Sequence, residues 1–155
     1  MAIEIERKFL VNKDKWNEQS KGKGVFYRQG YILIDPAKTI RVRVGADKGF
    51  ITIKGASVGA SRPEYDYEIP AQDAMEMLDN FCASDVSKTS YKLTYGGKLW
   101  EVDEFTGKNE GLIIAEIELR DEQEAIDLPD WIEQEVTDQE KYYNSNLSVK
   151  PYNSW

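Results

Sequence analysis

The chain has 155 residues, enough for one domain with its own core, and its 20 Lys and Arg against 28 Asp and Glu give a net charge of −8. Such a balance argues against coating nucleic acid through bulk charge, although cations can still gather in a concave site. There is no histidine and only one cysteine, Cys82, which excludes His-ligated zinc, His acid–base chemistry and an internal disulfide. Any metal must be held mostly by oxygen, which favours Mg²⁺, Mn²⁺ or Ca²⁺.

The chain shows no sign of a membrane or secretory segment. No stretch approaches the ~20 apolar residues of a membrane span, and the first residues are acidic where a signal peptide would be basic and apolar. Together with the single cysteine, this predicts a soluble, cytoplasmic protein with no membrane or nucleic-acid partner. No linker or charge block divides the sequence, so we expect a single domain over residues 1–155.

The first predicted strand, which begins at Ile3, alternates apolar and charged residues. Ile3 and Ile5 fall on one face, and Glu4, Glu6 and Lys8 fall on the other, because residues two apart in a strand share a face. Two carboxylates and one ammonium group therefore stand in a row on a strand whose other face is ready to be buried.

Similar strands follow along the chain. We expect them over residues 25–34, 39–44, 50–54, 62–69, 86–94, 99–105 and 111–119. A helical period marks residues 70–83, and we expect shorter helices around Trp16, over residues 121–126, and from Thr137, which forms a capping-box pattern with Glu140. Residues 148–155 are expected to be peripheral.

Charges of one sign stand together on these strands. Arg41 and Arg43 share a face, as do Glu116 and Glu118. Each such pair alone is more often a solvated strand face, but their recurrence on most strands calls for compensation of the like charges. A closed sheet would bring the charged faces inward around a wet lumen. Carboxylates there would bind divalent cations and the basic rows would bind phosphate oxygens, so the ligand that satisfies both is a metal-bound polyphosphate.

The order of these motifs resembles that of a known family. Glu4-x-Glu6-x-Lys8 is similar to the E-x-E-x-K motif of the CYTH superfamily, the triphosphate tunnel metalloenzymes. The remaining family elements follow in order over nearly the whole chain: Gln29-Gly30-Tyr31, Arg41-x-Arg43, Thr52-x-Lys54, Arg62-x-Glu64-Tyr65, Asp103 within residues 101–105, and Glu116-x-Glu118.

The resemblance implies an α+β fold, mainly β: a closed eight-stranded antiparallel β-barrel that encloses a triphosphate tunnel, with a few flanking helices. It also implies hydrolysis of a small-molecule triphosphate with Mg²⁺ or Mn²⁺. The length is similar to that of the short bacterial enzymes that hydrolyse inorganic tripolyphosphate to pyrophosphate and phosphate.

The resemblance also assigns roles to individual residues. The metal-facing acids would be Glu4, Glu6, Asp103, Glu116 and Glu118, with one metal held by some of Glu4, Glu6 and Glu118 and a second nearer Asp103 and Glu116. The phosphates would be gripped by Arg41, Arg43, Lys54, Arg62 and Lys88. A catalytic pair would be Lys8 and Tyr31, of which we expect Lys8 to position water or to stabilise charge.

The chain departs from the family in two places. Relatives have K-T-R-Y where this chain has K-T-S-Y at residues 88–91, so Ser90 replaces a tunnel arginine, and Lys92 on the same face would compensate in part. Near the C-terminus relatives carry further basic residues, where this chain has Glu140, Lys141 and Tyr143. Both changes bear on substrate preference and not on the fold.

Other functions remain open at this point. The same fold would serve a nucleoside or thiamine triphosphatase, a class IV-like adenylate cyclase, or a non-catalytic polyphosphate-binding module. A structural β-domain with solvated charged strands is the alternative without a site. The protein would be a monomer or a homodimer.

Overall fold

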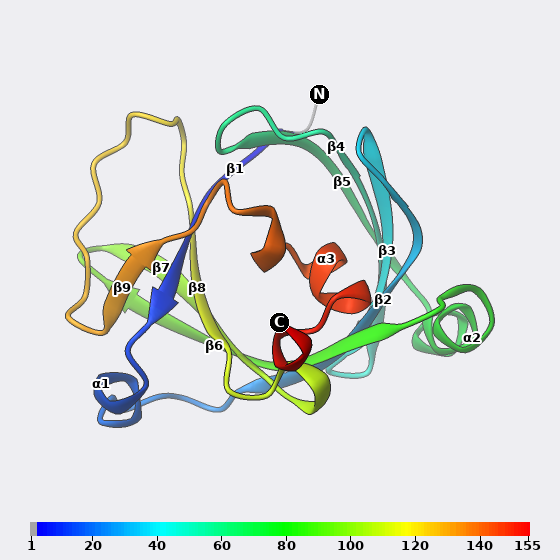
Figure 1. The fold of residues 1–155 in the computed structure, drawn as a ribbon, viewed down its shortest axis with the longest axis horizontal. Coiled ribbons are helices and arrows are strands. Elements are labelled where there is room, and N and C mark those ends of the chain that lie inside the picture. The colour runs from blue at the N-terminus through cyan, green and yellow to red at the C-terminus, as the bar shows by residue number, and fades with distance from the viewer. Residues whose placement is uncertain (1–2) are drawn as a thin grey trace.

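The computed structural model describes residues 3–155 and shows a mainly antiparallel β protein (Figure 1). Its strands are β1 (Ile3–Val11), β2 (Val25–Asp35), β3 (Lys38–Gly45), β4 (Lys48–Gly55), β5 (Ser61–Ile69), β6 (Asp85–Tyr95), β7 (Lys98–Phe105), β8 (Ile113–Glu118) and β9 (Ile132–Glu135). Its helices are α1 (Lys13–Asn17), α2 (Ala71–Phe81) and α3 (Asn144–Val149), with three short 3₁₀ turns, η1 (Gly107–Asn109), η2 (Glu140–Tyr142) and η3 (Tyr152–Ser154). Within residues 3–155, no helix is long and apolar enough to cross a membrane.

Eight strands are hydrogen-bonded in a closed ring, in the order β1-β5-β4-β3-β2-β6-β7-β8 and back to β1. Strand β1 makes the closure, because it pairs with β5 near its start, where Glu4 lies opposite Arg62, and with β8 further along, where Lys8 lies opposite Glu116. The predicted closed eight-stranded antiparallel sheet is confirmed. A ninth strand, β9, adds to β1 outside the ring and was not expected.

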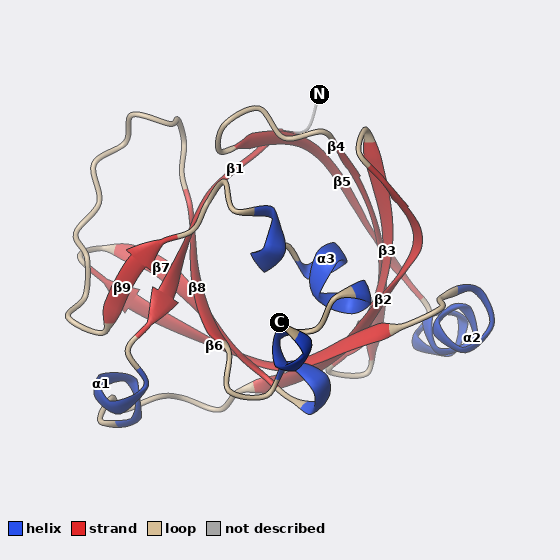
Figure 2. Cartoon of the chain, in the orientation of Figure 1, coloured by secondary structure: helices blue, strands red, loops and turns tan. Residues whose placement is uncertain are grey.

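Helix α2 covers the outer face of β2, β3 and β4 (Figure 2). Its buried residues Ala74 and Leu78 pack against Val42 of β3. The helix comes close enough that a Cβ on Gly30 would lie 2.9 Å from the Cβ of Cys82, and one on Gly49 would lie 2.7 Å from the Cβ of Ala74. The glycine of the Gln29-Gly30-Tyr31 motif therefore faces away from the lumen and allows this packing.

A second core lies on the outer face of β1, β7 and β8, under α1 and the segment that leads into β9. Trp16, Trp100 and Trp131 pack edge to face with ring centroids 5.0 to 6.0 Å apart and are almost fully buried. The indole nitrogen of Trp16 donates a hydrogen bond of 2.8 Å to Glu104. The structure confirms the short helix expected around Trp16.

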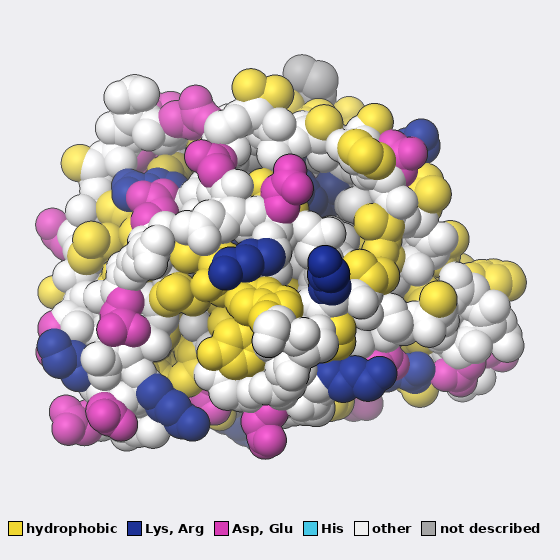
Figure 3. Space-filling model, in the orientation of Figure 1, with side chains coloured by type: hydrophobic (Ala, Val, Ile, Leu, Met, Phe, Trp, Pro, Cys, Tyr) yellow, Lys and Arg dark blue, Asp and Glu magenta, His cyan; other side chains and the backbone are white. Residues whose placement is uncertain are grey.

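The C-terminal segment lies across one end of the ring (Figures 1 and 2). Leu147 of α3 packs there among Val86, Phe105 and Ile114, each of which stands two residues from an inward-facing charged residue on its strand. The lumen is therefore apolar at this end and charged toward the other. Figure 3 shows this face, with apolar and basic side chains gathered over the segment.

The expectation of a peripheral tail is wrong at several positions. Ser148 is buried, and the backbone amide of Tyr152 donates a hydrogen bond of 2.8 Å to Asn109. The tail is tied to η1 by this bond and to the ring by the core around Leu147.

Two predicted helices are absent or displaced. Residues 121–126 are not helical: a bend and a turn over residues 121–123 lead into irregular chain. Asp121 accepts a hydrogen bond from the amide of Gln123, and Glu124 accepts one from the amide of Arg120. The predicted capping box at Thr137 does not form, because the hydroxyl of Thr137 accepts a hydrogen bond from the amide of Lys8 and donates one to Glu135. Helical structure begins later, as a 3₁₀ turn at Glu140.

The packing of the C-terminal segment can be tested by truncation of Leu147, whose side chain is fully buried. Leu147→Ala should lower the free energy of unfolding by about 2–5 kcal/mol, measured by urea denaturation, because it leaves a cavity in the core. Val149→Ala in the same helix is the control, since Val149 is 61% exposed, and it should change stability by about 0.5 kcal/mol or less. Equal effects of the two substitutions would contradict this packing.

Candidate functional site

A cavity of about 750 Å³ fills the charged part of the ring. Side chains from β1, β3, β4, β5, β6, β7 and β8 line it, and they are almost all charged: Glu4, Glu6, Lys8, Arg41, Arg43, Lys54, Glu64, Asp66, Lys88, Glu101, Glu116 and Glu118. Its rim is formed by the β6–β7 turn and by the segment after β8, at Gly96, Gly97, Lys98, Leu99, Arg120, Asp121 and Glu124. We call this cavity the tunnel.

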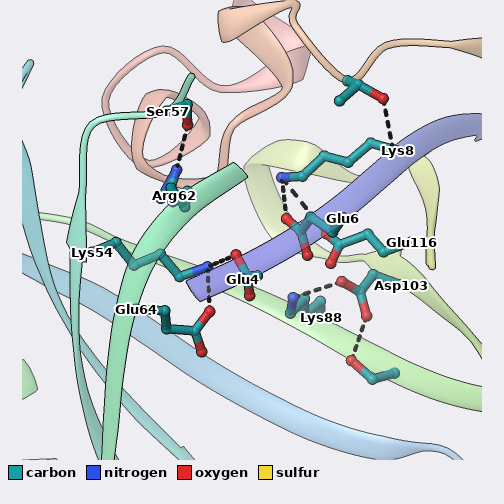
Figure 4. Close-up of polar contacts among 12 residues, drawn as sticks. Glu4, Glu6, Lys8, Lys54, Ser57, Arg62, Glu64, Lys88, Asp103 and Glu116 are labelled. Atoms are coloured by element: carbon teal, nitrogen blue, oxygen red, sulfur yellow. Dashed lines mark hydrogen bonds and ion pairs between the residues drawn. The ribbon is translucent and has the colours of Figure 1, made fainter. Parts of the chain in front are cut away.

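Lysines and carboxylates alternate around the tunnel as ion pairs (Figure 4). The ammonium group of Lys8 lies 3.8 Å from Glu6 and 3.6 Å from Glu116. The ammonium group of Lys54 lies 3.0 Å from Glu4 and 3.6 Å from Glu64. Each lysine thus stands between two carboxylates.

A third lysine has one carboxylate partner. The ammonium group of Lys88 lies 2.6 Å from Asp103, and both side chains are at most 2% exposed. We refer to the three sets, centred on Lys8, Lys54 and Lys88, as the lysine clusters.

The strand register explains how like charges along one strand are tolerated. Lys8 of β1 is directly opposite Glu116 of β8, and Lys54 of β4 is directly opposite Glu64 of β5. Directly opposite residues have Cβ atoms about 4.5–5.5 Å apart, which is closer than residues two apart along a strand, so opposite charges on neighbouring strands offset the repulsion along each strand. The compensation that the sequence called for comes from adjacent strands.

The compensation is incomplete around Glu6. Burial, followed by the negative charge of Glu116, raises the pKa of Glu6 from 4.5 to about 8. Burial would also raise the pKa of Glu116, but Lys8, Lys88 and Lys54 outweigh it and lower that pKa to about 2. The two carboxyl groups thus share one proton at neutral pH. Burial would lower the pKa of Lys8, yet Glu116 and Glu6 raise it, so Lys8 remains charged.

Within residues 3–155, the two arginines of β3 have no hydrogen bond or ion pair with a carboxylate. Arg41 donates a hydrogen bond of 3.1 Å to Thr52, and Arg43 donates one of 3.0 Å to Gln29. Burial, and then the charge of Arg41, lower the pKa of Arg43. The buried Nε of Arg41 has no partner among the described residues. Two cations held close together without an anion form a place that an anionic ligand would stabilise.

Two of the predicted residues, Tyr31 and Arg62, lie beside the tunnel. They line a small extension of about 20 Å³ toward α3, which they share with Lys8 and with Tyr143. The ammonium group of Lys8 lies 5.5 Å from the centroid of the Tyr143 ring. The structure therefore brings Lys8 and Tyr31 to the same extension, at the side of the tunnel that the C-terminal segment closes.

Asp103 and Ser90 are arranged differently from what the sequence led us to expect. The hydroxyl of Ser90 donates a hydrogen bond of 2.5 Å to Asp103, which also bonds to Lys88. Lys92, expected to compensate for Ser90, is exposed and lies opposite Glu101 without lining the tunnel. Position 90 therefore contributes a contact to a carboxylate and not a cation.

Sequence reasoning left some tunnel residues out of the candidate set. Glu64, Asp66 and Glu101 line the tunnel, and Thr52 is buried between Arg41 and Asp66. The signal for the acids was present, because Glu64 and Asp66, and Glu101 and Asp103, are spaced two apart like the acids that were selected. The bond from Thr52 to Asp66 depends on the pairing of β4 with β5 and has no sequence signal.

The acids fit a divalent cation in their chemistry. Their oxygens are hard ligands, and a cation at this place would favour the ionised form of Glu6, whose pKa is raised by burial and then by the negative charge of Glu116. Within residues 3–155, no three acidic side chains already stand close enough together to hold an ion. Mg²⁺ commonly takes only one or two carboxylates and completes its shell with water and substrate phosphate. Glu6 and Glu116 are the pair that could hold it.

The raised pKa of Glu6 predicts how the stability of the metal-free protein depends on pH. Because the pKa of Glu6 rises from 4.5 to about 8 on folding, the folded state binds more protons in this range, and the free energy of unfolding falls as pH rises through it. Glu6→Gln should therefore raise the melting temperature at pH 8 in EDTA and flatten its dependence on pH between 5 and 8, measured by circular dichroism. A variant that melts lower than the wild type at pH 8 would contradict this.

Comparisons with known proteins agree with this geometry. A CYTH domain matches residues 2–151. An inorganic triphosphatase of Acetivibrio thermocellus is 53% identical over 156 residues, covering 100% of this chain and 99% of that protein. An inorganic triphosphatase of Nitrosomonas europaea is 35% identical over 152 residues, covering 94% of this chain and 97% of that protein. The crystal structure of the inorganic triphosphatase NE1496 aligns with a TM-score of 0.67 and 30% identity over 96% of both chains. With its closed ring of eight strands and charged tunnel, the chain belongs to the CYTH family.

Proposed function

We propose that this protein hydrolyses inorganic tripolyphosphate to pyrophosphate and phosphate with the help of Mg²⁺ or Mn²⁺. The observation that carries the proposal is the tunnel itself, in which basic and acidic side chains interleave and neither sign dominates. A polyanion alone would be repelled by the acids and a cation alone by the lysines, whereas a metal–triphosphate complex offers a partner to both. The relatives named inorganic triphosphatase, at 53% and 35% identity, support it.

The lining of the tunnel favours an inorganic substrate over a nucleotide. Among the described residues that line it there is no aromatic ring on which a base could stack. Tyr31 and Tyr143 are near, but the extension that they line has room for about one water molecule, since its volume is about 20 Å³. The charged side chains therefore have phosphate groups as their most suitable ligands.

The basic side chains would bind the phosphates and stabilise charge that develops during hydrolysis. Arg41 and Arg43 stand on one strand with guanidinium groups free of carboxylates within the described residues, and Lys54 stands on the neighbouring strand β4. Fixed cations aimed at the transferring phosphoryl group supply the electrostatic stabilisation that dominates such reactions. We assign Arg62 to the outer part of the same site, beside Tyr31.

The acids would hold the metal. Glu6 and Glu116 are the central pair, with Glu4 and Glu118 on the same strands and two residues away. A bound Mg²⁺ or Mn²⁺ would neutralise phosphate charge and favour in-line attack by water. Its positive charge would also lower the pKa of Glu6 and favour the ionised form, against the effects of burial and of Glu116.

Lys8 would act as a charged group. Glu116 and Glu6 keep it protonated against the effect of burial, so it is unsuited to accept a proton from water. From its place beside Tyr31 it would instead position the attacking water or stabilise phosphate charge.

The proposed activity predicts which triphosphate is cleaved. Phosphate release should be fastest with tripolyphosphate, slower with ATP, and absent in EDTA. Arg41→Ala should lower kcat/KM by about 10²–10³-fold, the usual loss for one group that stabilises transition-state charge. Arg28→Ala is the matched control, because Arg28 pairs with Asp79 and Asp85 outside the tunnel, and its activity should stay close to that of the wild type.

Each alternative function gives a different result in this assay. Faster release from ATP would make the protein a nucleoside triphosphatase. Conversion of ATP to cyclic AMP and pyrophosphate would place it with the cyclases. Tight binding without turnover would make it a polyphosphate-binding module, and equal losses in the Arg41 and Arg28 variants would place the activity outside the tunnel.

The role of Lys8 can be tested by two substitutions. Lys8→Arg keeps a positive charge and should retain more activity than Lys8→Met, which removes the charge at similar length. Measured kcat values should separate the two variants by about 10-fold or more. Loss of activity to the same level in both would indicate a proton-accepting role, and full activity in Lys8→Met would exclude Lys8 from the reaction.

A further inference from the structure

Both carboxylate oxygens of Asp103 already have a donor. Lys88 donates a hydrogen bond of 2.6 Å to Oδ2, and Ser90 donates one of 2.5 Å to Oδ1. All three side chains are buried, at 1% exposure for Asp103, 2% for Lys88 and 6% for Ser90. The fit follows from the pairing of β6 with β7, in which Ser90 is directly opposite Asp103.

This cluster differs from the other two in the place of its carboxylate, because the acids of the Lys8 and Lys54 clusters all line the tunnel. In the Lys8 cluster the ammonium group lies 3.6 and 3.8 Å from its carboxylates, beyond hydrogen-bonding distance, and both acids also line the tunnel. Asp103 does not line the tunnel, whereas Lys88 does. The pair is therefore arranged with the cation toward the ligand and the carboxylate behind it.

A metal ion on Asp103 would meet an unfavourable field. It would share the carboxylate with an ammonium group that lies 2.6 Å from one oxygen, and two like charges a few ångströms apart in a buried site repel strongly. To make room, Lys88 would have to give up a charge-assisted hydrogen bond in a place where an unpaired ammonium is costly.

We propose that Asp103 is a positioning residue that fixes Lys88 for phosphate binding, with Ser90 as its second contact, and that it is not a ligand of the metal. The inference rests on the proposed function, because it takes the tunnel ligand to be a metal–triphosphate. A lysine already held in one rotamer loses less side-chain entropy when it binds a phosphate than a mobile lysine does. Ser90 bonds to Oδ1 and leaves Oδ2 of Asp103 to Lys88.

Two binding measurements test this role, and neither depends on turnover. The first is the affinity for Mn²⁺, measured by electron paramagnetic resonance. It compares the wild type with the double variant Lys88→Met/Asp103→Asn, which removes one charge of each sign and so leaves the net charge of the tunnel unchanged. Removing both partners also avoids a buried unpaired charge that could prevent folding.

The Mn²⁺ affinity of the double variant should stay within about threefold of the wild type, whereas Glu6→Gln should weaken it by about 10-fold or more, as expected for loss of a ligand. A loss in the double variant as large as that in Glu6→Gln would overturn the proposal.

The second measurement is the affinity for tripolyphosphate in EDTA, by calorimetry. Asp103→Asn should weaken binding by about 10-fold, although it removes a negative charge, because Lys88 would turn toward Glu101 or Glu116. Glu101→Gln is the matched control: it removes a negative charge from the same strand, two residues away, and should not weaken binding. Ser90→Ala keeps the ion pair and should cost less than Asp103→Asn. Equal or tighter binding by Asp103→Asn would overturn the proposal.

These outcomes are separate from those that test the proposed function. A wild type that binds Mn²⁺ and tripolyphosphate but hydrolyses neither tripolyphosphate nor ATP would contradict the proposed activity. Both binding comparisons would still decide the role of Asp103. If the wild type binds no Mn²⁺ on its own, the calorimetric comparison of Asp103→Asn with Glu101→Gln decides alone.

Discussion

Buried charge without a partner is costly, and this constraint governs the centre of the molecule. Several strands carry same-sign pairs on the inner face of the ring, and no single strand could bury such a pair without compensation. Closure of the sheet places Lys8 opposite Glu116 and Lys54 opposite Glu64, so each strand supplies the compensation for its neighbour. The apolar cores are displaced to the outside of the ring and to one end, and stability comes from there. The tunnel is thereby left for function.

The compensation within the tunnel is only partial, and this is what connects the fold to the chemistry. Burial and the charge of Glu116 raise the pKa of Glu6, and the guanidinium groups of Arg41 and Arg43 have no carboxylate bond among the described residues, so one cavity holds unfavourably placed charge of both signs. A metal ion would stabilise the ionised form of Glu6, and a triphosphate would pair with Arg41 and Arg43. Functional sites often keep such unfavourable local electrostatics, and the surrounding structure supplies the stability that they lose. In contrast, both carboxylate oxygens of Asp103 have a hydrogen-bond donor, which fits a residue that positions its neighbour Lys88.

The strands and their charged faces could be predicted from the sequence because a strand repeats every two residues, and the rows beginning at Glu4 and Arg41 follow that period without interruption. The partners of each charge could not, since they depend on register: nothing local shows that Ser90 lies opposite Asp103. The closed end of the tunnel had no signal either, because α3 is only six residues long and buries little besides Leu147. The capping pattern at Thr137 failed because a backbone amide of β1 takes its hydroxyl.

We infer that the tunnel needs a cation and a polyphosphate together. The most direct test is how strongly each of the two binds in the presence of the other. Calorimetry with a non-hydrolysable imido analogue of tripolyphosphate, with and without Mn²⁺, measures this coupling. We expect Mn²⁺ to strengthen binding of the analogue by about 10-fold or more. The analogue should strengthen binding of Mn²⁺ by the same factor, as linkage requires. Affinities that do not depend on each other would contradict this inference.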